Sequence, residues 1–105
     1  MHGRVVLVTG GGRGVGRGIA TRFLEAGADV VICGRKSPES PLQVGDRSAT
    51  FVQADVRVIE DVDRLIGEVV AAHGRLDVLV NNAGGSPSAD SATVSPRFSA
   101  SIIHL

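Results

Sequence analysis

The sequence predicts an α/β fold in which parallel strands alternate with helices, and two features near its beginning support this prediction. The apolar run from Val5 to Val8 is typical of a buried strand and leads directly into a glycine-rich turn. Val15, Ile19 and Phe23 then recur every four positions, as on one face of a helix. Strands and helices that alternate in this way are joined by right-handed crossovers, which make the strands parallel.

The first half of the chain is predicted to contain three strands and one helix. The strands cover residues 4–8, 29–33 and 49–54, and the helix covers residues 15–26. Gly27 is expected to end the helix in a left-handed conformation. Pro38 and Pro41 disfavour a long helix between the second and third strands, so residues 34–46 are expected to form a loop.

The second half contains the strongest helical pattern of the chain. Its apolar face comprises Val58, Val62, Leu65, Ile66, Val69 and Val70. This pattern predicts a helix over residues 58–73 that ends at Gly74, followed by a fourth strand over residues 76–80. Ser95 and Pro96 are typical of a helix start, so a further helix is expected from there.

Composition excludes several classes of protein. The 105 residues include 11 basic and 11 acidic ones, and the net charge of zero gives no indication of a nucleic-acid partner. No apolar run reaches the length of a membrane span and the N-terminus lacks a signal-peptide core, so we expect a cytoplasmic protein without a membrane partner. The single cysteine, Cys33, lies in an apolar run and is expected to be a core residue in a reducing compartment.

The glycine turn, residues 10–16, is a candidate anion site. Glycines let backbone N–H groups approach a phosphate, and the following helix N-terminus adds a partial positive charge. A nucleoside-triphosphatase loop is excluded, because Gly16 is followed by Arg17 and not by Lys-Ser/Thr. The strict G-x-G-x-x-G fingerprint is also absent. The pattern present is Thr9-Gly10-x3-Gly14-x-Gly16, and a glycine loop that binds no ligand is the alternative interpretation.

Two further motifs make the pattern specific. Asp55-Val56 follows the third strand, and Asn81-Asn82-Ala83-Gly84 closes the fourth. Together with the glycine turn, these motifs resemble the cofactor-binding half of a short-chain dehydrogenase/reductase over nearly the whole chain. The resemblance implies a Rossmann-like parallel sheet with strand order 3-2-1-4, truncated before its C-terminal strands. Residues 1–105 would then be a partial dinucleotide-binding domain that ends inside the helix starting near residue 95.

The resemblance also implies where a dinucleotide would lie. The three motif glycines would approach the pyrophosphate, Asp55 would meet the adenine amine, and the turn at residues 81–84 would lie against the adenosine ribose. A plain turn is the alternative for Asn81-Asn82. The expected cofactor-binding residues are Thr9, Gly10, Gly12, Arg13, Gly14, Val15, Gly16, Arg35, Asp55, Val56, Asn82, Ala83 and Gly84.

The residues after the second strand favour NADP over NAD. An acid at this place usually holds the ribose 2′-OH of NAD. Here Gly34 is followed by Arg35 and Lys36, and the nearest acid, Asp29, begins the strand at its other end. Arg35 offers a planar fork for a 2′-phosphate, and Arg13 could add a second cation. A solvated loop charge is the alternative interpretation of Arg35.

The resemblance implies hydride transfer between NADP(H) and a small carbonyl or alcohol, in a full-length protein that is usually a homo-oligomer. That chemistry needs a tyrosine, a lysine four residues later, a serine and an asparagine. The sequence has no tyrosine, and its single lysine, Lys36, falls at the adenosine end. We therefore assign no catalytic residue and no metal ligand, and expect this chain alone to be inactive. The alternative is a non-catalytic nucleotide-binding remnant or a non-functional fragment.

Truncation would also affect stability. The fourth strand, residues 76–80, would expose an unpaired edge, and the first helix would stand nearly alone on its face of the sheet. Part of the valine-rich sheet would then be open to water. From the sequence we expect the isolated chain to be marginally stable, aggregation-prone or dependent on a partner.

Overall fold

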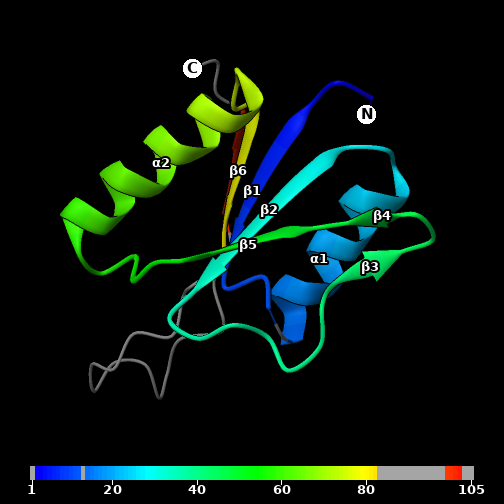
Figure 1. Ribbon diagram of the computed structural model, residues 1–105, viewed down its shortest axis with the longest axis horizontal. Coiled ribbons are helices and arrows are strands. Elements are labelled where there is room, and N and C mark those ends of the chain that lie inside the picture. The colour runs from blue at the N-terminus through cyan, green and yellow to red at the C-terminus, as the bar shows by residue number, and fades with distance from the viewer. Residues whose placement is uncertain (1, 13, 83–98, 103–105) are drawn as a thin grey trace.

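The computed structural model describes residues 2–12, 14–82 and 99–102, which form a five-stranded sheet between two helices (Figure 1). The sheet order is β5-β2-β1-β6-β7, and β3 pairs with β4 in a separate hairpin. The elements are β1 (Val5–Thr9), α1 (Gly14–Glu25), β2 (Asp29–Gly34), β3 (Gln43–Val44), β4 (Arg47–Ser48), β5 (Thr50–Gln53), α2 (Ile59–His73), β6 (Val78–Asn81) and β7 (Ser99–Ile102).

The predicted parallel sheet is confirmed. β5, β2, β1 and β6 run parallel, and this order is the predicted 3-2-1-4 arrangement. Both helices end where a glycine was expected to stop them, Gly27 with a φ of 94° and Gly74 with a φ of 79°. Positive φ is inexpensive only for glycine, so these two residues set the helix lengths.

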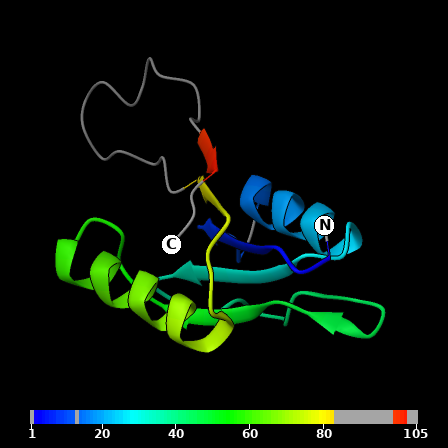
Figure 2. The same ribbon diagram turned by 90° about the horizontal axis from the view of Figure 1, so that it is seen from above.

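The core has two layers because β1 and β2 are buried on both faces. Along β1, Val6 and Val8 face α1, whereas Val5 and Leu7 face α2. Figure 2 shows the two helices on opposite sides of the sheet. Continuous apolar runs, and not alternating ones, are typical of parallel strands covered in this way. Neither described helix combines the length and the apolar composition that crossing a bilayer requires.

The segment between β2 and β5 differs from the prediction. Residues 34–46 were expected to be a loop, which is confirmed for residues 35–42, but Gln43–Val44 and Arg47–Ser48 form the antiparallel β3–β4 hairpin. Leu42 and Val44 of this segment pack on the α1 side of the core. The expectation of an open valine-rich face is wrong, since Ile32 on that face is 1% exposed. The Arg47 guanidinium holds the hairpin by donating to two carbonyls of the α1–β2 turn, at 2.8 and 2.9 Å.

The C-terminal segment also differs from the prediction. A helix was expected from residue 95, but Ser99–Ile102 forms β7, antiparallel to β6, so the helix prediction is wrong for these four residues. Residues 95–98 and 103–105 lie outside the described part of the chain. Pairing with β7 satisfies N–H and C=O groups of β6 that a helix would leave without backbone partners. The expectation of an unpaired β6 edge is therefore also wrong.

Candidate functional site

The carboxyl ends of the parallel strands meet at one edge of the sheet, toward its lower left in Figure 1. Backbone hydrogen bonds continue beyond the strand ends there. The N–H of Gly10 donates to the Cys33 carbonyl over 2.9 Å, and the N–H of Ala54 donates to the Gly34 carbonyl over 2.9 Å. The segments that follow β1, β2 and β5 therefore lie side by side, at the edge where open parallel sheets bind ligands.

Thr9 joins the glycine turn to the segment after β6. Its side chain is 5% exposed, and its hydroxyl oxygen accepts a hydrogen bond of 2.8 Å from the backbone N–H of Asn82. The same hydroxyl lies 3.1 Å from the Oδ1 atom of Asn81, to which it can donate. The buried Thr9 hydroxyl can therefore both accept and donate a hydrogen bond, and it connects the central strands β1 and β6 at their carboxyl ends.

The glycine turn is compact on one side and open on the other. Gly16 is buried, and a Cβ atom there would collide with the Gly10 carbonyl oxygen and lie 2.5 Å from the Nδ2 atom of Asn82. Gly14 has a φ of 62°, and a Cβ atom there would meet no atom of the described residues within 4 Å. The first turn of α1 carries no acidic side chain that would neutralise its dipole. This combination suits an anion held by backbone N–H groups.

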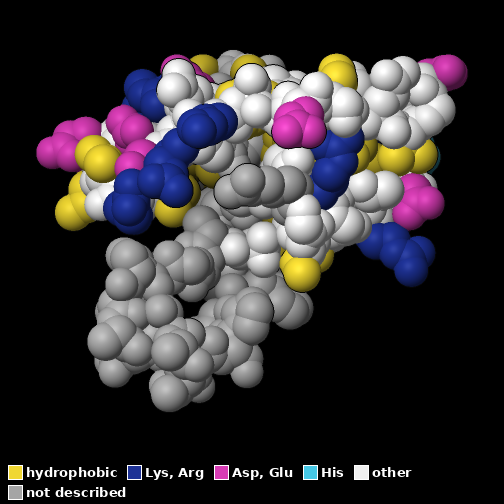
Figure 3. Space-filling model, turned by 90° about the horizontal axis from the view of Figure 1, so that it is seen from below, with side chains coloured by type: hydrophobic (Ala, Val, Ile, Leu, Met, Phe, Trp, Pro, Cys, Tyr) yellow, Lys and Arg dark blue, Asp and Glu magenta, His cyan; other side chains and the backbone are white. Residues whose placement is uncertain are grey.

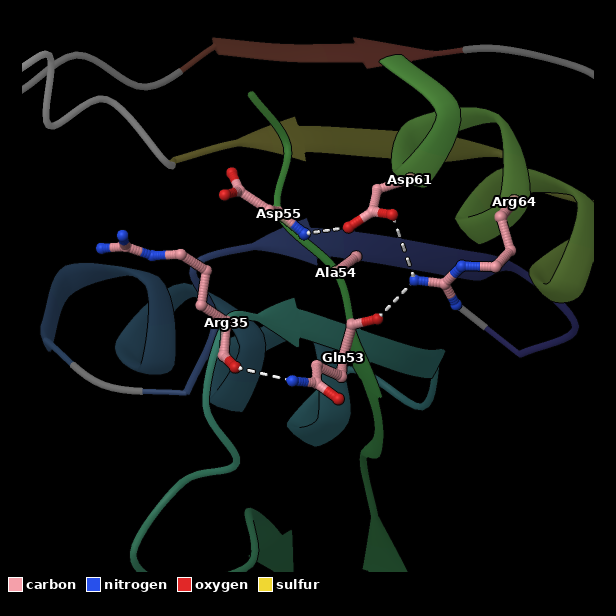
Figure 4. Close-up of a pocket in the computed structure, with 6 residues that line it drawn as sticks. All are labelled: Arg35, Gln53, Ala54, Asp55, Asp61 and Arg64. Carbon is pink, nitrogen blue, oxygen red and sulfur yellow. Dashed lines mark hydrogen bonds and ion pairs between the residues drawn. The ribbon is translucent and has the colours of Figure 1, made fainter. Parts of the chain in front are cut away.

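The β2–β3 loop, residues 35–42, carries the predicted cation. Arg35 is exposed, and its backbone carbonyl accepts a hydrogen bond of 3.2 Å from the Nε2 atom of Gln53. In Figure 4 the Arg35 side chain extends away from the sheet, toward the same side as the Asp55 carboxylate. A guanidinium in this position can bind a phosphate that approaches the edge from solvent.

Asp55 is held by its own loop. Its carboxylate accepts hydrogen bonds from the Nε and Nη2 atoms of Arg57, at 3.0 and 2.9 Å, and from the Arg57 backbone N–H at 3.0 Å. The hydrogen bonds from Arg57 lower the pKa of Asp55 to about 2, and the charge of Arg35 adds to this effect. Asp55 therefore stays a charged acceptor at neutral pH. Val56 beside it packs on the α2 side of the core.

A shallow pocket of about 240 Å³ lies between the end of β5, the start of α2 and the β2–β3 loop (Figure 4). Asp61 accepts a hydrogen bond of 2.9 Å from the backbone N–H of Asp55, and Arg64 donates to the Gln53 carbonyl over 2.7 Å. In Figure 3, which views the molecule from below, acidic and basic side chains gather near the end where α2 begins. The residues that line the pocket are Arg35, Gln53, Ala54, Asp55, Asp61 and Arg64.

Asp61 and Arg64 were not predicted. Asp61 lies in the first turn of α2, where acids favour the helix dipole, and this signal could have identified it. Arg64 has no comparable local signal, because its carbonyl partner belongs to β5, eleven positions earlier.

The structure brings the predicted residues together in two groups. Around the glycine turn, Asn82 is hydrogen-bonded to Thr9 and lies close to Gly16, which also approaches Gly10. Arg35 and Asp55 line the pocket. Gly12 lies in the turn, and Val15 at the start of α1 is 63% exposed. Arg13, Ala83 and Gly84 lie outside the described residues.

Two other sequence interpretations concern single residues. Cys33 is fully buried, which confirms it as a core residue, and burial raises the pKa of its thiol to about 11. Lys36 is exposed in the β2–β3 loop. Within residues 2–12, 14–82 and 99–102, no three side chains of the metal-binding types are grouped to hold an ion.

Comparison with known proteins relates this arrangement to one family. A family model described as short chain dehydrogenase matches residues 4–105. An L-fucose dehydrogenase from Bos taurus is 46% identical over 86 residues, which cover 81% of this chain and 32% of that protein. A hydroxynaphthalene reductase from Aspergillus fumigatus is 42% identical over 90 residues, which cover 80% of this chain and 33% of that protein.

A solved structure has a fold similar to that of this chain. A ligand-free aldohexose dehydrogenase from Thermoplasma acidophilum matches with a TM-score of 0.70 at 32% identity, over 79% of this chain and 30% of that one. The chain thus spans about a third of the length of these relatives.

Proposed function

The chain belongs to the short chain dehydrogenase family, and from this premise we propose that it forms the NADP(H)-binding part of an oxidoreductase. The whole protein would transfer hydride between NADP(H) and a small carbonyl or alcohol substrate. One observation carries the proposal: an exposed arginine, Arg35, follows β2 at the same sheet edge as a glycine turn at the start of α1. Backbone N–H groups and a guanidinium are the two kinds of donor that a phosphorylated dinucleotide needs.

The residues of this edge fit such a cofactor. The open side of Gly14 and the first turn of α1 would hold the pyrophosphate. Asp55 would accept from the adenine amine through its carboxylate, which Arg57 holds in place by hydrogen bonds. When bound, the nicotinamide supplies or accepts the hydride, and the residues of this chain would bind and orient the rest of the molecule.

The placement of charges supports NADP over NAD. Asp29 begins β2 and pairs in register with Val5, at the amino edge of the sheet. It also forms an ion pair of 3.5 Å with Arg47. Asp29 is thus at the wrong end of β2 to accept from a ribose 2′-OH, whereas Arg35 follows the correct end.

Titration of NADPH and NADH into the purified chain, followed by nicotinamide fluorescence, tests the proposal. We expect tighter binding of NADPH. Arg35→Ala should cost about 1–3 kcal/mol of NADPH binding free energy and little for NADH, because a charge-assisted contact to the 2′-phosphate is lost. Arg22→Ala, which removes an exposed arginine of α1, is the matched control. Equal losses for both nucleotides would refute the assignment of Arg35.

A second candidate function is nucleotide binding without catalysis. The sequence favours it because it has no tyrosine, and its only lysine, Lys36, lies in the β2–β3 loop. We expect no turnover of NADPH or NADP⁺ with simple ketones or alcohols. An in-frame Ser…Tyr-x-x-x-Lys in the DNA beyond the Leu105 codon would restore the oxidoreductase reading, and an immediate stop would favour the second candidate. The cytoplasmic location and the homo-oligomeric state of a full-length protein stay predictions.

A further inference from the structure

We propose that Arg17 is a positioning residue for cofactor discrimination. Its guanidinium fastens the β2–β3 loop to the glycine turn, so that the anion cradle and Arg35 keep a fixed spatial relation. The inference rests on the proposed NADP(H) binding, but Arg17 is assigned no contact with the nucleotide.

Arg17 lies on the first turns of α1 and reaches two segments at once. Its Nη1 atom donates to the Gly12 carbonyl at 3.2 Å and to the Ser40 carbonyl at 3.0 Å. Its Nη2 atom donates to the Ser40 hydroxyl at 3.3 Å and to the Pro41 carbonyl at 3.1 Å. One contact thus goes to the glycine turn and three go to the β2–β3 loop, which makes the guanidinium a bridge between them.

A second contact, independent of Arg17, joins the same two segments. A Cβ atom on Gly12 would lie 3.5 Å from the Cβ atom of Pro38, so the glycine turn and the loop already pack against each other. Pro38 is half-buried, whereas Arg35, Lys36 and Ser37 before it are exposed. The glycine turn therefore supports the loop segment that carries Arg35, the cation proposed to discriminate between the cofactors.

Among the described residues, the other attachments of the loop lie at its two ends. The Gly34 carbonyl accepts from Ala54 just before the loop begins, and Leu42 at its end is 4% exposed in the core. Within the described part of the chain, Arg17 supplies most of the polar contacts between these ends. Its own position is set by α1, whose Ala20 and Leu24 are buried against the sheet. A rigid helix thereby holds a loop that would otherwise have to be ordered when a nucleotide binds, and such ordering lowers affinity.

The four contacts use both terminal nitrogens of the arginine fork. A lysine has one terminal nitrogen on a flexible stem and cannot reproduce the contacts of Nη1 and Nη2 together. Arg17→Lys keeps the charge and weakens the bridge, so it separates positioning from simple attraction of an anionic ligand. Arg22→Ala on the same helix removes a charge that is far more exposed and is the matched control.

Two measurements on the purified chain test the inference. The first is backbone hydrogen exchange of residues 36–41 without nucleotide, which we expect to be faster in Arg17→Ala and Arg17→Lys than in Arg22→Ala. The second is titration with NADPH and NADH. Arg17→Ala should weaken NADPH binding about tenfold and NADH binding less, so that the preference for NADPH falls. Adding Arg17→Ala to Arg35→Ala should then change the preference no further, because the two residues act on one contact.

The outcomes separate this inference from the function on which it rests. Equal exchange rates, or an unchanged NADPH preference in Arg17→Ala while Arg35→Ala abolishes it, would overturn the role of Arg17. If Arg35→Ala leaves the preference unchanged but Arg17→Ala still speeds exchange, the proposed 2′-phosphate contact has failed. Arg17 would then hold a loop that does not discriminate, and the specificity role would fall with that contact.

Discussion

The hydroxyl of Thr9 and the backbone N–H of Asn82 are joined by a hydrogen bond of 2.8 Å across 73 positions of sequence. This bond links the residue that ends β1 to the residue that follows β6. Since both residues belong to predicted motifs, their contact explains why a threonine precedes the glycine turn. It holds the turn and the asparagine segment in one arrangement at the carboxyl edge.

Replacing Thr9 by valine should therefore loosen both segments together. Thr9→Val keeps the shape of the side chain but leaves the half-buried Asn82 N–H without this acceptor, at a cost of about 1–3 kcal/mol in the free energy of unfolding. Urea denaturation followed by circular dichroism measures the loss. Thr50→Val, which removes an exposed hydroxyl from β5, should change the stability by less than about 0.5 kcal/mol. Similar losses in both variants would contradict the role of the Thr9 bond.

Gly16→Ala should disrupt the glycine turn. The added methyl group would meet the Gly10 backbone and the Asn82 amide, so the turn must shift, and we expect a loss of about 1–3 kcal/mol in stability together with weaker nucleotide binding. Gly18→Ala is the control on the same helix, because a Cβ atom there meets nothing within 4 Å. It should stabilise α1 by up to about 1 kcal/mol. A stable Gly16→Ala variant with unchanged melting would argue against this close approach.

The buried acid Asp77 should make stability depend on pH. It is 2% exposed, accepts from the backbone N–H of Val5 at 2.9 Å, and pairs with Arg75 at 2.6 Å and Arg4 at 3.4 Å. The hydrogen bond from Arg75, with that from Val5, lowers the pKa of Asp77 from 3.8 to about 2. A carboxyl with a lowered pKa stabilises the fold above its unfolded pKa, and this contribution is lost as the pH falls from about 4 to about 2.

Asp77→Asn is expected to destabilise the chain at pH 7, and the difference from the unmodified protein should shrink as the pH falls through that window. Thermal melts at several pH values provide the measurement. Asp63→Asn, which changes an exposed acid of α2, serves as the control. A difference that stays constant down to pH 2 would show that the Asp77 charge contributes nothing.

The Cys33 thiol should be unreactive in the folded chain. It is fully buried, and its raised pKa of about 11 leaves little thiolate at pH 8. Ellman's reagent should therefore react slowly with the native chain and rapidly in urea. The double variant Cys33→Ala/Ser37→Cys moves the thiol to an exposed loop position and should react at once. Rapid reaction of the unmodified chain would indicate an open core.

Much of the parallel sheet could be predicted because its signals are local. The valine run of β1, the apolar face of α2 and the helix ends at Gly27 and Gly74 each depend on residues that are neighbours in sequence. The β3–β4 hairpin was missed for the opposite reason. Leu42 and Val44 are separated from other apolar residues in sequence and become core residues only after packing near α1.

The candidate site likewise contains residues that were predicted from the sequence and residues that were not. The glycine pattern, Arg35, Asp55 and Asn82 were identified from motifs, since each motif is a short run with a defined chemistry. Arg17 and Asp61 were not identified, because their hydrogen-bond partners become their neighbours only in the folded chain. Asp77 lies within the predicted fourth strand, and its burial beside two arginines was not predicted.

The sequence by itself determined the order of the four parallel strands and the two helices, the glycine turn and the cation after β2, because apolar periodicity and glycine act over a few residues. Only the tertiary structure decided that Ser99–Ile102 pairs with β6, that the hairpin covers the α1 face, and that Arg17 bridges the turn and the loop. These contacts join residues that are distant in sequence. Such contacts depend on which backbone groups still lack hydrogen-bond partners, and which apolar groups are still exposed, once the elements have packed. A local sequence pattern does not contain this information.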